Sequence, residues 1–425
     1  MFSVINARVI KNFFALAILQ GGNYLLPLIL IPFLVRTLGM NTFGDWVFAV
    51  SFVSIFRTFV DYGFDLTATR AVSVHRDDRT FVSELYATVV VTRLVIFVLS
   101  YLILLGLAFA FTNIWNVVVL AQLSMLVLIG EALLPIWLYQ GMESMATITQ
   151  LRLGYRALFV LIVILLVQGP QDVLLIPAVE AVGSLMTGLI ALYLACSRYG
   201  LSFRWPRYSF IKSELKTGAT VFVSYLAVHF YTTINTVLLG FLQGAVAVAQ
   251  YSIAEKVYSA IRGMFGPVVQ ALFPSLSRLY EQDFNAFRRA ARNIAIAFFA
   301  ALVGLAIICF FLAQTIVLLI AGQPDPIATH ALQILSVTLA IGLGTLFSPL
   351  LVIQKKNHLL VSVTFFTMVV NLAIVFPLIY YYGVIGVAMA LFITQLFQLV
   401  AQLIANAEVL ISRRSTAIVK DVPTL

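Results

Sequence analysis

Charged residues are scarce in this 425-residue chain, since Asp, Glu, Lys and Arg together make up only 10% of it. Soluble domains carry about 25% charged residues and about 45–50% apolar ones, whereas 62% of this chain is hydrophobic. Too few polar residues therefore remain to cover a core of this size with a hydrated surface. The composition excludes an ordinary soluble enzyme, a disordered chain and a disulfide-stapled secreted domain, and it predicts an integral membrane protein.

Residues that usually carry catalysis or metal binding are also rare, with two cysteines and four histidines in the chain. Cys196 and Cys309 lie in apolar runs, so we interpret them as small hydrophobic residues. No two histidines have metal-ligand spacing, and the sequence contains no Ser-His-Asp set and no glycine loop typical of phosphate binding. We therefore expect a protein that is not an enzyme and that has no catalytic residue, metal or cofactor.

What the chain does contain is long apolar runs. Twelve of them have about 20 residues or more, the length that crosses a hydrocarbon core of about 30 Å. The segments left over are too short to form a sizeable soluble domain. The first run follows Arg8 and Lys11 and is long enough to stay in the bilayer, so no cleaved signal peptide is expected. The predicted spans are 12–36, 42–64, 84–111, 115–140, 146–168, 172–196, 215–241, 247–273, 291–321, 328–353, 358–381 and 384–411.

The positive charges are distributed on one side of these spans. Of the 26 Lys and Arg residues, 22 lie in the termini, in the even-numbered connections or, for Arg93, just inside the third span on the same side. This group includes Arg152 and Arg156, whereas odd-numbered connections such as 112–116 and 322–327 contain no cation. The positive-inside rule therefore predicts that both termini and the even-numbered connections are cytoplasmic. The net charge of +9 then reports orientation and contact with anionic lipids, not nucleic-acid binding.

The two halves of the chain resemble each other at two places. The segment Pro135–Gln140 ends the fourth span as Pro349–Gln354 ends the tenth, and Leu38–Gly39 ends the first as Leu239–Gly240 ends the seventh. Six spans per half would keep the same orientation, which predicts two bundles, 1–205 and 206–425, related by a pseudo-two-fold axis along the membrane normal. The alternative is that proline and glycine simply mark helix ends in both halves.

A few charged residues remain inside the predicted spans. A charge at the centre of a bilayer costs about 2.5–3.5 kcal/mol or more, so each should face a partner or a water-filled cavity. The cations are Arg36, Arg57, Lys256 and Arg262, and the acids are Asp61, Glu131, Glu180 and Glu255.

The eighth span carries two polar stripes. At 100° per residue, Tyr251, Glu255, Tyr258 and Arg262 share one face, and Lys256 lies on a neighbouring stripe. We interpret this face as the wall of a cavity that binds an anion. The alternative is that Glu255 and Arg262 pair with neighbouring helices and only stabilise the bundle.

Other spans offer further candidates, each with a structural alternative. Arg57 and Asp61 are four residues apart and could pair with each other, and Arg36 lies close enough to an outer end to snorkel. Asn23, Tyr24 and Asn235 lie on polar faces of the first and seventh spans, where amides and tyrosines suit sugars but also suit helix packing.

Several motifs together carry a family resemblance that covers nearly the whole chain. They are the runs Asp61–Arg70, His75–Arg79, Leu138–Glu143, Tyr251–Lys256 and Gln270–Pro274. With these motifs the chain resembles the O-antigen (Wzx-type) polysaccharide flippases of the multidrug/oligosaccharidyl-lipid/polysaccharide exporter superfamily. It departs from some drug-exporting relatives, which bind their coupling ion through an acidic residue in the first span, because the first span here has none.

The resemblance implies an all-α, V-shaped exporter of twelve helices in two six-helix bundles, located in the bacterial inner membrane. It also implies a function in polysaccharide and lipopolysaccharide biosynthesis. The protein would move an undecaprenyl-diphosphate-linked oligosaccharide from the cytoplasmic to the outer leaflet by alternating access, coupled to an H⁺ or Na⁺ gradient. Membrane lipids, a polysaccharide polymerase and chain-length regulator proteins are its expected partners.

The residue patterns and the resemblance together give a set of site residues. The residues expected to bind the substrate are Arg57, Lys256, Arg262, Arg36, Tyr24, Asn23, Asn235, Tyr251 and Tyr258. The residues expected to couple transport to an ion are Glu255, Asp61, Glu131 and Glu180.

Three other functions compete with this interpretation. A drug or other lipid-precursor exporter of the same fold would need an acidic cavity if its cargo were cationic. A membrane-embedded polymerase or acyltransferase would need catalytic residues presented at one face, and the short cation-free outer loops disfavour it. A scaffold without transport of its own would give the buried charges little purpose.

Overall fold

A computed structural model of the chain describes residues 7–110, 115–203 and 205–410, and every regular element in these ranges is helical. Side chains are described from Leu26 onward, except at positions 109, 110, 115, 116, 224, 230, 231, 271, 408 and 410. Eight helices in the described part are long and apolar enough to cross a membrane, and the bent pair Tyr208–His229 and Thr232–Gln243 would make a ninth. The prediction of an all-α, multi-pass membrane protein is confirmed.

The first half of the described chain forms seven α-helices and one 3-10 helix. They are α1 (Ala7–Asp61), α2 (Phe64–Val74), α3 (Arg79–Ala110), α4 (Trp115–Leu133), α5 (Ile136–Gly141), α6 (Met145–Leu166), η2 (Pro170–Asp172) and α7 (Leu175–Tyr199). The second half forms eight α-helices. They are α8 (Tyr208–Gln243), α9 (Ala245–Gly263), α10 (Gly266–Gln282), α11 (Phe284–Ala321), α12 (Pro326–Ala340), α13 (Gly344–Ile353), α14 (Asn357–Ala405) and α15 (Ala407–Leu410).

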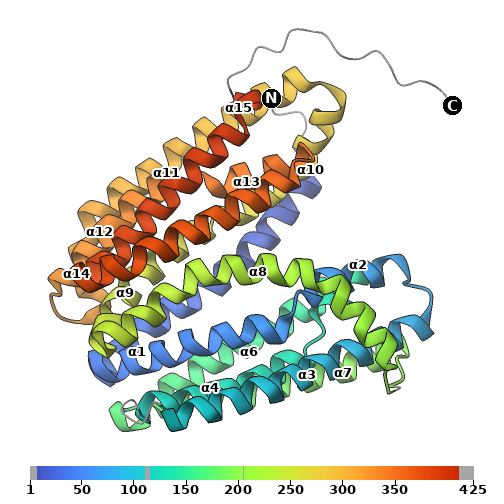
Figure 1. Ribbon diagram of the computed structural model, residues 1–425, viewed down its shortest axis with the longest axis horizontal. Helices are drawn as coiled ribbons and strands as arrows, with labels where there is room; N and C mark the ends of the chain where they lie inside the picture. Colours follow the sequence, from blue (N-terminus) through green and yellow to red (C-terminus); the bar gives the residue numbers. More distant parts are fainter. Residues whose placement is uncertain (1–6, 111–114, 204, 411–425) are drawn as a thin grey trace.

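Two of these helices, α1 and α14, are much longer than a bilayer is thick, at 55 and 49 residues. A straight α1 would extend about 80 Å, whereas a hydrocarbon core is about 30 Å thick. Each is interrupted by a glycine in the left-handed region, Gly39 with φ 74° and Gly383 with φ 55°, where glycine carries no steric penalty. α1 breaks at Gly39, and its ribbon reverses direction (Figure 1), so the predicted spans 12–36 and 42–64 form a hairpin.

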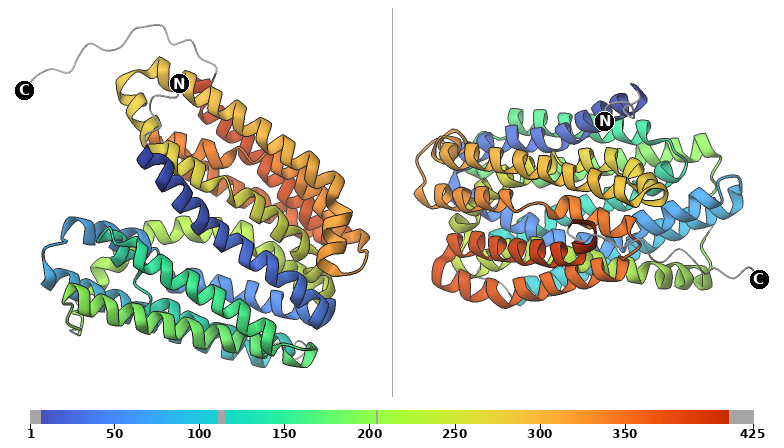
Figure 2. Two further views of the ribbon diagram at one scale, coloured as in Figure 1. Left: turned by 180° about the vertical axis from the view of Figure 1, so that it is seen from behind. Right: turned by 90° about the horizontal axis from the view of Figure 1, so that it is seen from above.

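The helices form two groups that meet at one end and diverge at the other (Figure 1; Figure 2, left). The first group contains α3, α4, α6 and α7, and the second contains α9 to α14. α1 packs against α4 and α6 of the first group and against α9 and α11 of the second, while α8 packs against both α1 and α14. α2 and α10 lie at the diverging end, which is the side of the predicted cytoplasmic connections.

The buried apolar clusters follow this division. One cluster joins residues of both groups and of α1, such as Leu128 of α4, Leu34 of α1 and Leu335 of α12. Two others each lie mainly within one group. The first includes Leu85 of α3 and Ala191 of α7, and the second includes Phe287 of α11 and Phe347 of α13. Each group therefore has a core of its own in addition to the core that the two groups share.

The two groups are closely packed where they meet. A side chain at Gly44 of α1 would collide with the carbonyl of Ala245 in α9, because the two backbones touch there. The ring of Phe48 lies against Gly240 and forms an edge-to-face pair with Phe241, with ring centroids 5.1 Å apart. These contacts hold α1 against α8 and α9 at this end of the molecule.

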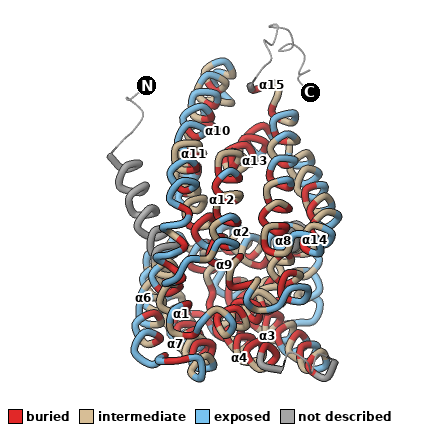
Figure 3. The backbone as a smooth tube through the Cα atoms, turned by 90° about the vertical axis from the view of Figure 1, so that its left-hand side faces the viewer, coloured by how far each residue is buried: buried red, intermediate tan, exposed pale blue. Residues whose placement is uncertain are grey.

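The outward faces of the helices remain apolar. Buried residues lie on the sides of the helices that face their neighbours, and exposed residues lie on the outer sides (Figure 3). Large apolar side chains are among the exposed ones, for example Leu102 of α3, Phe311 of α11 and Ile404 of α14. An extended apolar surface of this kind is expected of a protein whose outer faces contact lipid.

Candidate substrate-binding cavity

A polar cavity of about 290 Å³ lies where α1 meets α4, α6 and α7, and α9 of the other group reaches into its wall. Its charged lining residues come from five helices, one or two from each. They are Arg57 of α1, Glu131 of α4, Arg152 and Arg156 of α6, Glu180 of α7 and Lys256 of α9. Four of these residues, Arg57, Glu131, Glu180 and Lys256, lie inside predicted spans and were expected to face a partner or a cavity. The structure brings these four together.

Arg57 and Glu131 form the central ion pair of the cavity. Arg57 Nε donates to Glu131 Oε2 at 2.6 Å, and Arg57 Nη2 donates to Glu131 Oε1. The guanidinium group therefore forms a bidentate contact with the carboxylate. Such paired contacts are stronger and more directional than a single one. The alternative that Arg57 pairs with Asp61 is wrong, because the helix packing presents Arg57 to α4 instead.

Arg152 and Arg156 were missed as site residues by the sequence analysis. Both had been counted with the cytoplasmic cations, but the structure places them in α6, four residues apart and on the cavity wall. The positive charge of Arg57 repels the guanidinium groups of both residues. Two signals were available in the sequence: both arginines lie inside the predicted span 146–168, and they have i,i+4 spacing around Tyr155. The spacing alone is too common on helix surfaces to identify a site.

The cavity carries an excess of positive charge. Four cations and two carboxylates line it, which gives a formal net charge of +2. Lys256 lies 3.2 Å from Glu255, the residue before it in α9, and both side chains are partly exposed. An anion that entered the cavity would therefore meet guanidinium and ammonium groups, while Trp46, Tyr155 and Phe159 supply aromatic surface beside them.

Asp61 belongs to a second charged site outside this cavity. The side chain of Arg93, only 2% exposed, donates from Nη2 to Asp65 Oδ1 at 2.7 Å and lies 3.8 Å from Asp61 Oδ1. His229 of α8 also interacts electrostatically with Asp61. One buried guanidinium thus serves two carboxylates on the α1–α2 segment, and Arg93 is not one of the surface cations that mark a membrane side.

Other predicted residues lie elsewhere in the described structure. Tyr251, Tyr258 and Asn235 are at most 3% exposed and are packed inside the protein. Arg262 lies 3.4 Å from the hydroxyl of Tyr258. Their contact with a substrate stays a prediction.

Three of the predicted residues lie in the first span. Arg36 donates to the carbonyl of Leu319, near the end of α11, and so joins α1 to α11. The side chains of Asn23 and Tyr24 lie outside the described residues. Among the described residues, no group of three His, Cys, Asp or Glu side chains could hold a metal ion.

Comparison with known sequences adds independent findings. A family model described as polysaccharide biosynthesis protein matches residues 9–280. A putative O-antigen transporter of Escherichia coli (strain K12) is 29% identical over 267 residues, which are 63% of this chain and 64% of that protein, just under two thirds of its length. A putative O-antigen transporter of Shigella dysenteriae is 27% identical over 387 residues, which are 91% of this chain and 96% of that protein.

Comparison with solved structures concerns the fold. The inward-facing conformation of a multidrug resistance MATE family transporter of the MOP superfamily matches with a TM-score of 0.65 and 14% identity, over 92% of this chain and 98% of that chain. The outward-facing conformation of a transporter of that description gives 0.54 at 14% identity, over 94% and 93%. The Vibrio cholerae MATE transporter VcmN in its bent form gives 0.59 at 13% identity, over 95% and 97%. The chain therefore has a MATE-like fold.

Proposed function

The chain belongs to the polysaccharide biosynthesis protein family, and from this premise we propose that it is a flippase for an undecaprenyl-diphosphate-linked oligosaccharide. The observation that carries the proposal is the cavity with a formal charge of +2 among membrane-spanning helices. A diphosphate that bears a sugar chain cannot cross hydrocarbon unaided, because an unpaired charge at the bilayer centre costs several kcal/mol. Guanidinium groups in a wet cavity offset that desolvation, and the polyprenyl chain stays in an apolar environment.

Within this proposal each charged residue of the cavity has a role. Arg57, Arg152, Arg156 and Lys256 bind the diphosphate or acidic sugars, since planar guanidinium groups match phosphate oxygens in pairs. Glu131 pairs with Arg57, and a bound diphosphate would compete with this carboxylate for the guanidinium group. Glu131 and Glu180 are then placed to take up the coupling ion, H⁺ or Na⁺, while Asp61 and Glu255 stay candidates for the same task outside the Arg57–Glu131 pair.

The mechanism we propose is rocking of two six-helix bundles, residues 1–205 and 206–425, with twelve spans in all. The reversal of α1 at Gly39, the break in α14 at Gly383 and the separate cores of the two groups support this layout. With the even-numbered connections on the cytoplasmic side, as we propose, the diverging end would face the cytoplasm, which corresponds to an inward-open arrangement. The higher TM-score against the inward-facing relative agrees with this assignment.

Export of cationic drugs, the alternative considered from the sequence, fits the cavity less well. Cationic cargo would be repelled by a lining with a formal charge of +2, which stays positive even when Glu255, 3.2 Å from Lys256, is counted with it. The sign of the cavity therefore favours an anionic cargo.

A deletion strain tests the proposal. Cells that lack the gene should accumulate lipid-linked repeat units on the inner leaflet of the inner membrane and should lose surface polysaccharide. The wild-type gene should restore it, and an Arg57→Gln, Lys256→Gln double variant at equal protein level should not. Normal surface polysaccharide in the deletion strain, or full restoration by the double variant, would refute the assignment.

A further inference from the structure

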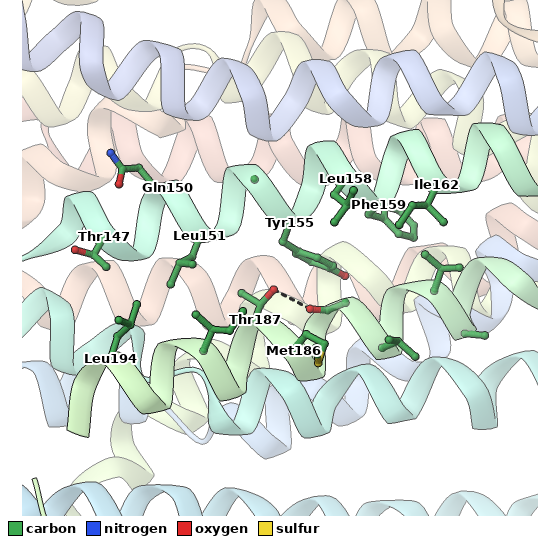
Figure 4. Close-up of a pocket in the computed structure, with 16 residues that line it drawn as sticks. Thr147, Gln150, Leu151, Tyr155, Leu158, Phe159, Ile162, Met186, Thr187 and Leu194 are labelled. Carbon is green, nitrogen blue, oxygen red and sulfur yellow. Dashed lines mark hydrogen bonds between the residues drawn. The ribbon is translucent and has the colours of Figure 1, made fainter. Parts of the chain in front are cut away.

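A long apolar groove runs along the outside of the first helix group, between α6 and α7 (Figure 4). The two helices lie next to each other at the surface of this group (Figure 2, left). The groove extends from Thr147 to Ile162 on α6 and from Leu194 back to Ala178 on α7, and its volume is about 900 Å³. Fifteen helical steps correspond to about 23 Å, most of the thickness of a hydrocarbon core.

This groove and the cationic cavity share one wall. Tyr155, Phe159 and Thr187 line both of them. The Tyr155 hydroxyl donates to the carbonyl of Glu180 at 3.0 Å, and its ring packs directly on Gly183. In Figure 4 the Tyr155 ring lies between the two helices. The wall is therefore one side chain thick, with an apolar space on one side and the arginines on the other.

A second apolar groove lacks this connection. It has a volume of about 430 Å³, is lined by residues of α11, α12 and α14 such as Phe310, Ile334 and Ile385, and shares no lining residue with the cavity. Acyl chains of the bilayer can cover any apolar groove that faces lipid. Of these two grooves, the one between α6 and α7 adjoins a cationic site for an anionic head group, so it could select a lipid that carries such a head group.

We propose that the α6–α7 groove holds the polyisoprenoid chain of the transported lipid while its diphosphate lies among Arg57, Arg152 and Arg156. The inference rests on the proposed function and adds the place where the apolar part of the substrate binds. The chain is covalently joined to the diphosphate, so it must leave the cavity at an apolar boundary. The wall of Tyr155 and Thr187 is such a boundary, and a groove of about 900 Å³ lies directly behind it.

Gly154 offers a direct test because it lines the groove. A Cβ atom added there would have no neighbouring atom within 4 Å, so a larger side chain has room to extend into the groove. Gly154 does not line the cavity. Gly154→Leu should therefore fill the groove and leave the charges in place. Gly304 of α11 is equally open and lies in the other group, so Gly304→Leu is the matched control. Met186→Trp narrows the groove from α7 and serves as a second variant.

The measurement is the dissociation constant of undecaprenyl diphosphate for the purified full-length chain in detergent. We expect Gly154→Leu and Met186→Trp to weaken binding about tenfold. This loss corresponds to roughly two methylene groups of the polyisoprenoid chain that are no longer buried in the groove. Gly154→Ala and Gly304→Leu should bind as the wild type does.

Unchanged binding by both groove variants would overturn the inference and leave the proposed function standing. Weaker binding by Gly304→Leu to the same extent would also overturn it, because the loss would then not depend on the groove. A wild-type chain that does not bind undecaprenyl diphosphate would refute the proposed function itself.

Discussion

Neutralising the two arginines of α6 is the perturbation that most directly examines the cavity. Arg152→Gln and Arg156→Gln each remove one of the four cations, so the formal net charge of the cavity falls from +2 to +1. Glutamine keeps part of the length and the hydrogen-bonding capacity of the side chain. Any loss of binding therefore reports charge more than shape.

The size of the effect follows from the separation and the local dielectric. Two unit charges about 4 Å apart interact by about 1 kcal/mol in water and by about 4 kcal/mol at an effective dielectric constant of 20. Arg152 is exposed and Arg156 partly exposed, which places them nearer the aqueous limit. We expect each substitution to weaken binding of undecaprenyl diphosphate by about 1–2 kcal/mol, which is roughly 5- to 30-fold.

Titration of the purified variants with undecaprenyl diphosphate measures this effect, and surface polysaccharide in complemented deletion cells measures its consequence. Arg70→Gln is the matched control, because Arg70 of α2 is exposed, lies near the same end of the molecule and does not line the cavity. The expected loss should shrink as salt is added. Equal binding by Arg152→Gln, Arg156→Gln and Arg70→Gln would refute the reasoning, since the cavity would then not attract the anion.

Three further predictions concern other parts of the structure. Glu131→Gln removes the carboxylate that holds Arg57 and should tighten undecaprenyl diphosphate binding several-fold in the same titration; weaker binding would show that Glu131 helps to hold the ligand. Gly44→Leu places a side chain where α1 touches α9 and should destabilise the protein by about 1–3 kcal/mol, seen as a lower Tm than that of Gly106→Leu; equal Tm values would contradict this close packing. Arg76 donates to Glu143 at 2.6 Å and lowers the pKa of that carboxyl, so the pair is intact above the usual carboxyl pKa and is lost as pH falls through the lowered value. Proteolysis of the connection between α2 and α3 (residues 75–78), which contains Arg76, should proceed at the same rate at pH 7 and pH 5 and faster near pH 3. Glu143→Gln should abolish this pH dependence. Faster proteolysis already at pH 5 would show that the pair does not form.

Part of the site could be predicted from the sequence because burial of charge is a strong constraint. Arg57, Glu131, Glu180 and Lys256 stand in apolar runs, where an ionised group must have a partner or a cavity. The same logic was not applied to Arg152 and Arg156, because they were grouped with the cytoplasmic cations although the predicted span 146–168 contains both. Composition describes where a residue lies along the membrane normal and not which way it points around the bundle.

The sequence by itself determined that the chain is a helical membrane protein, where its apolar runs lie and which charges need explanation. These properties depend on composition and on distances along the chain, which are local. Only the tertiary structure decided that Arg57 pairs with Glu131, 74 residues away, and not with Asp61 on its own helix. It also showed that Arg93 lies between Asp61 and Asp65. A separate result of the packing is the apolar groove behind Tyr155. Contacts between distant helices depend on how the helices pack and rotate against each other, and helical periodicity carries no information about that.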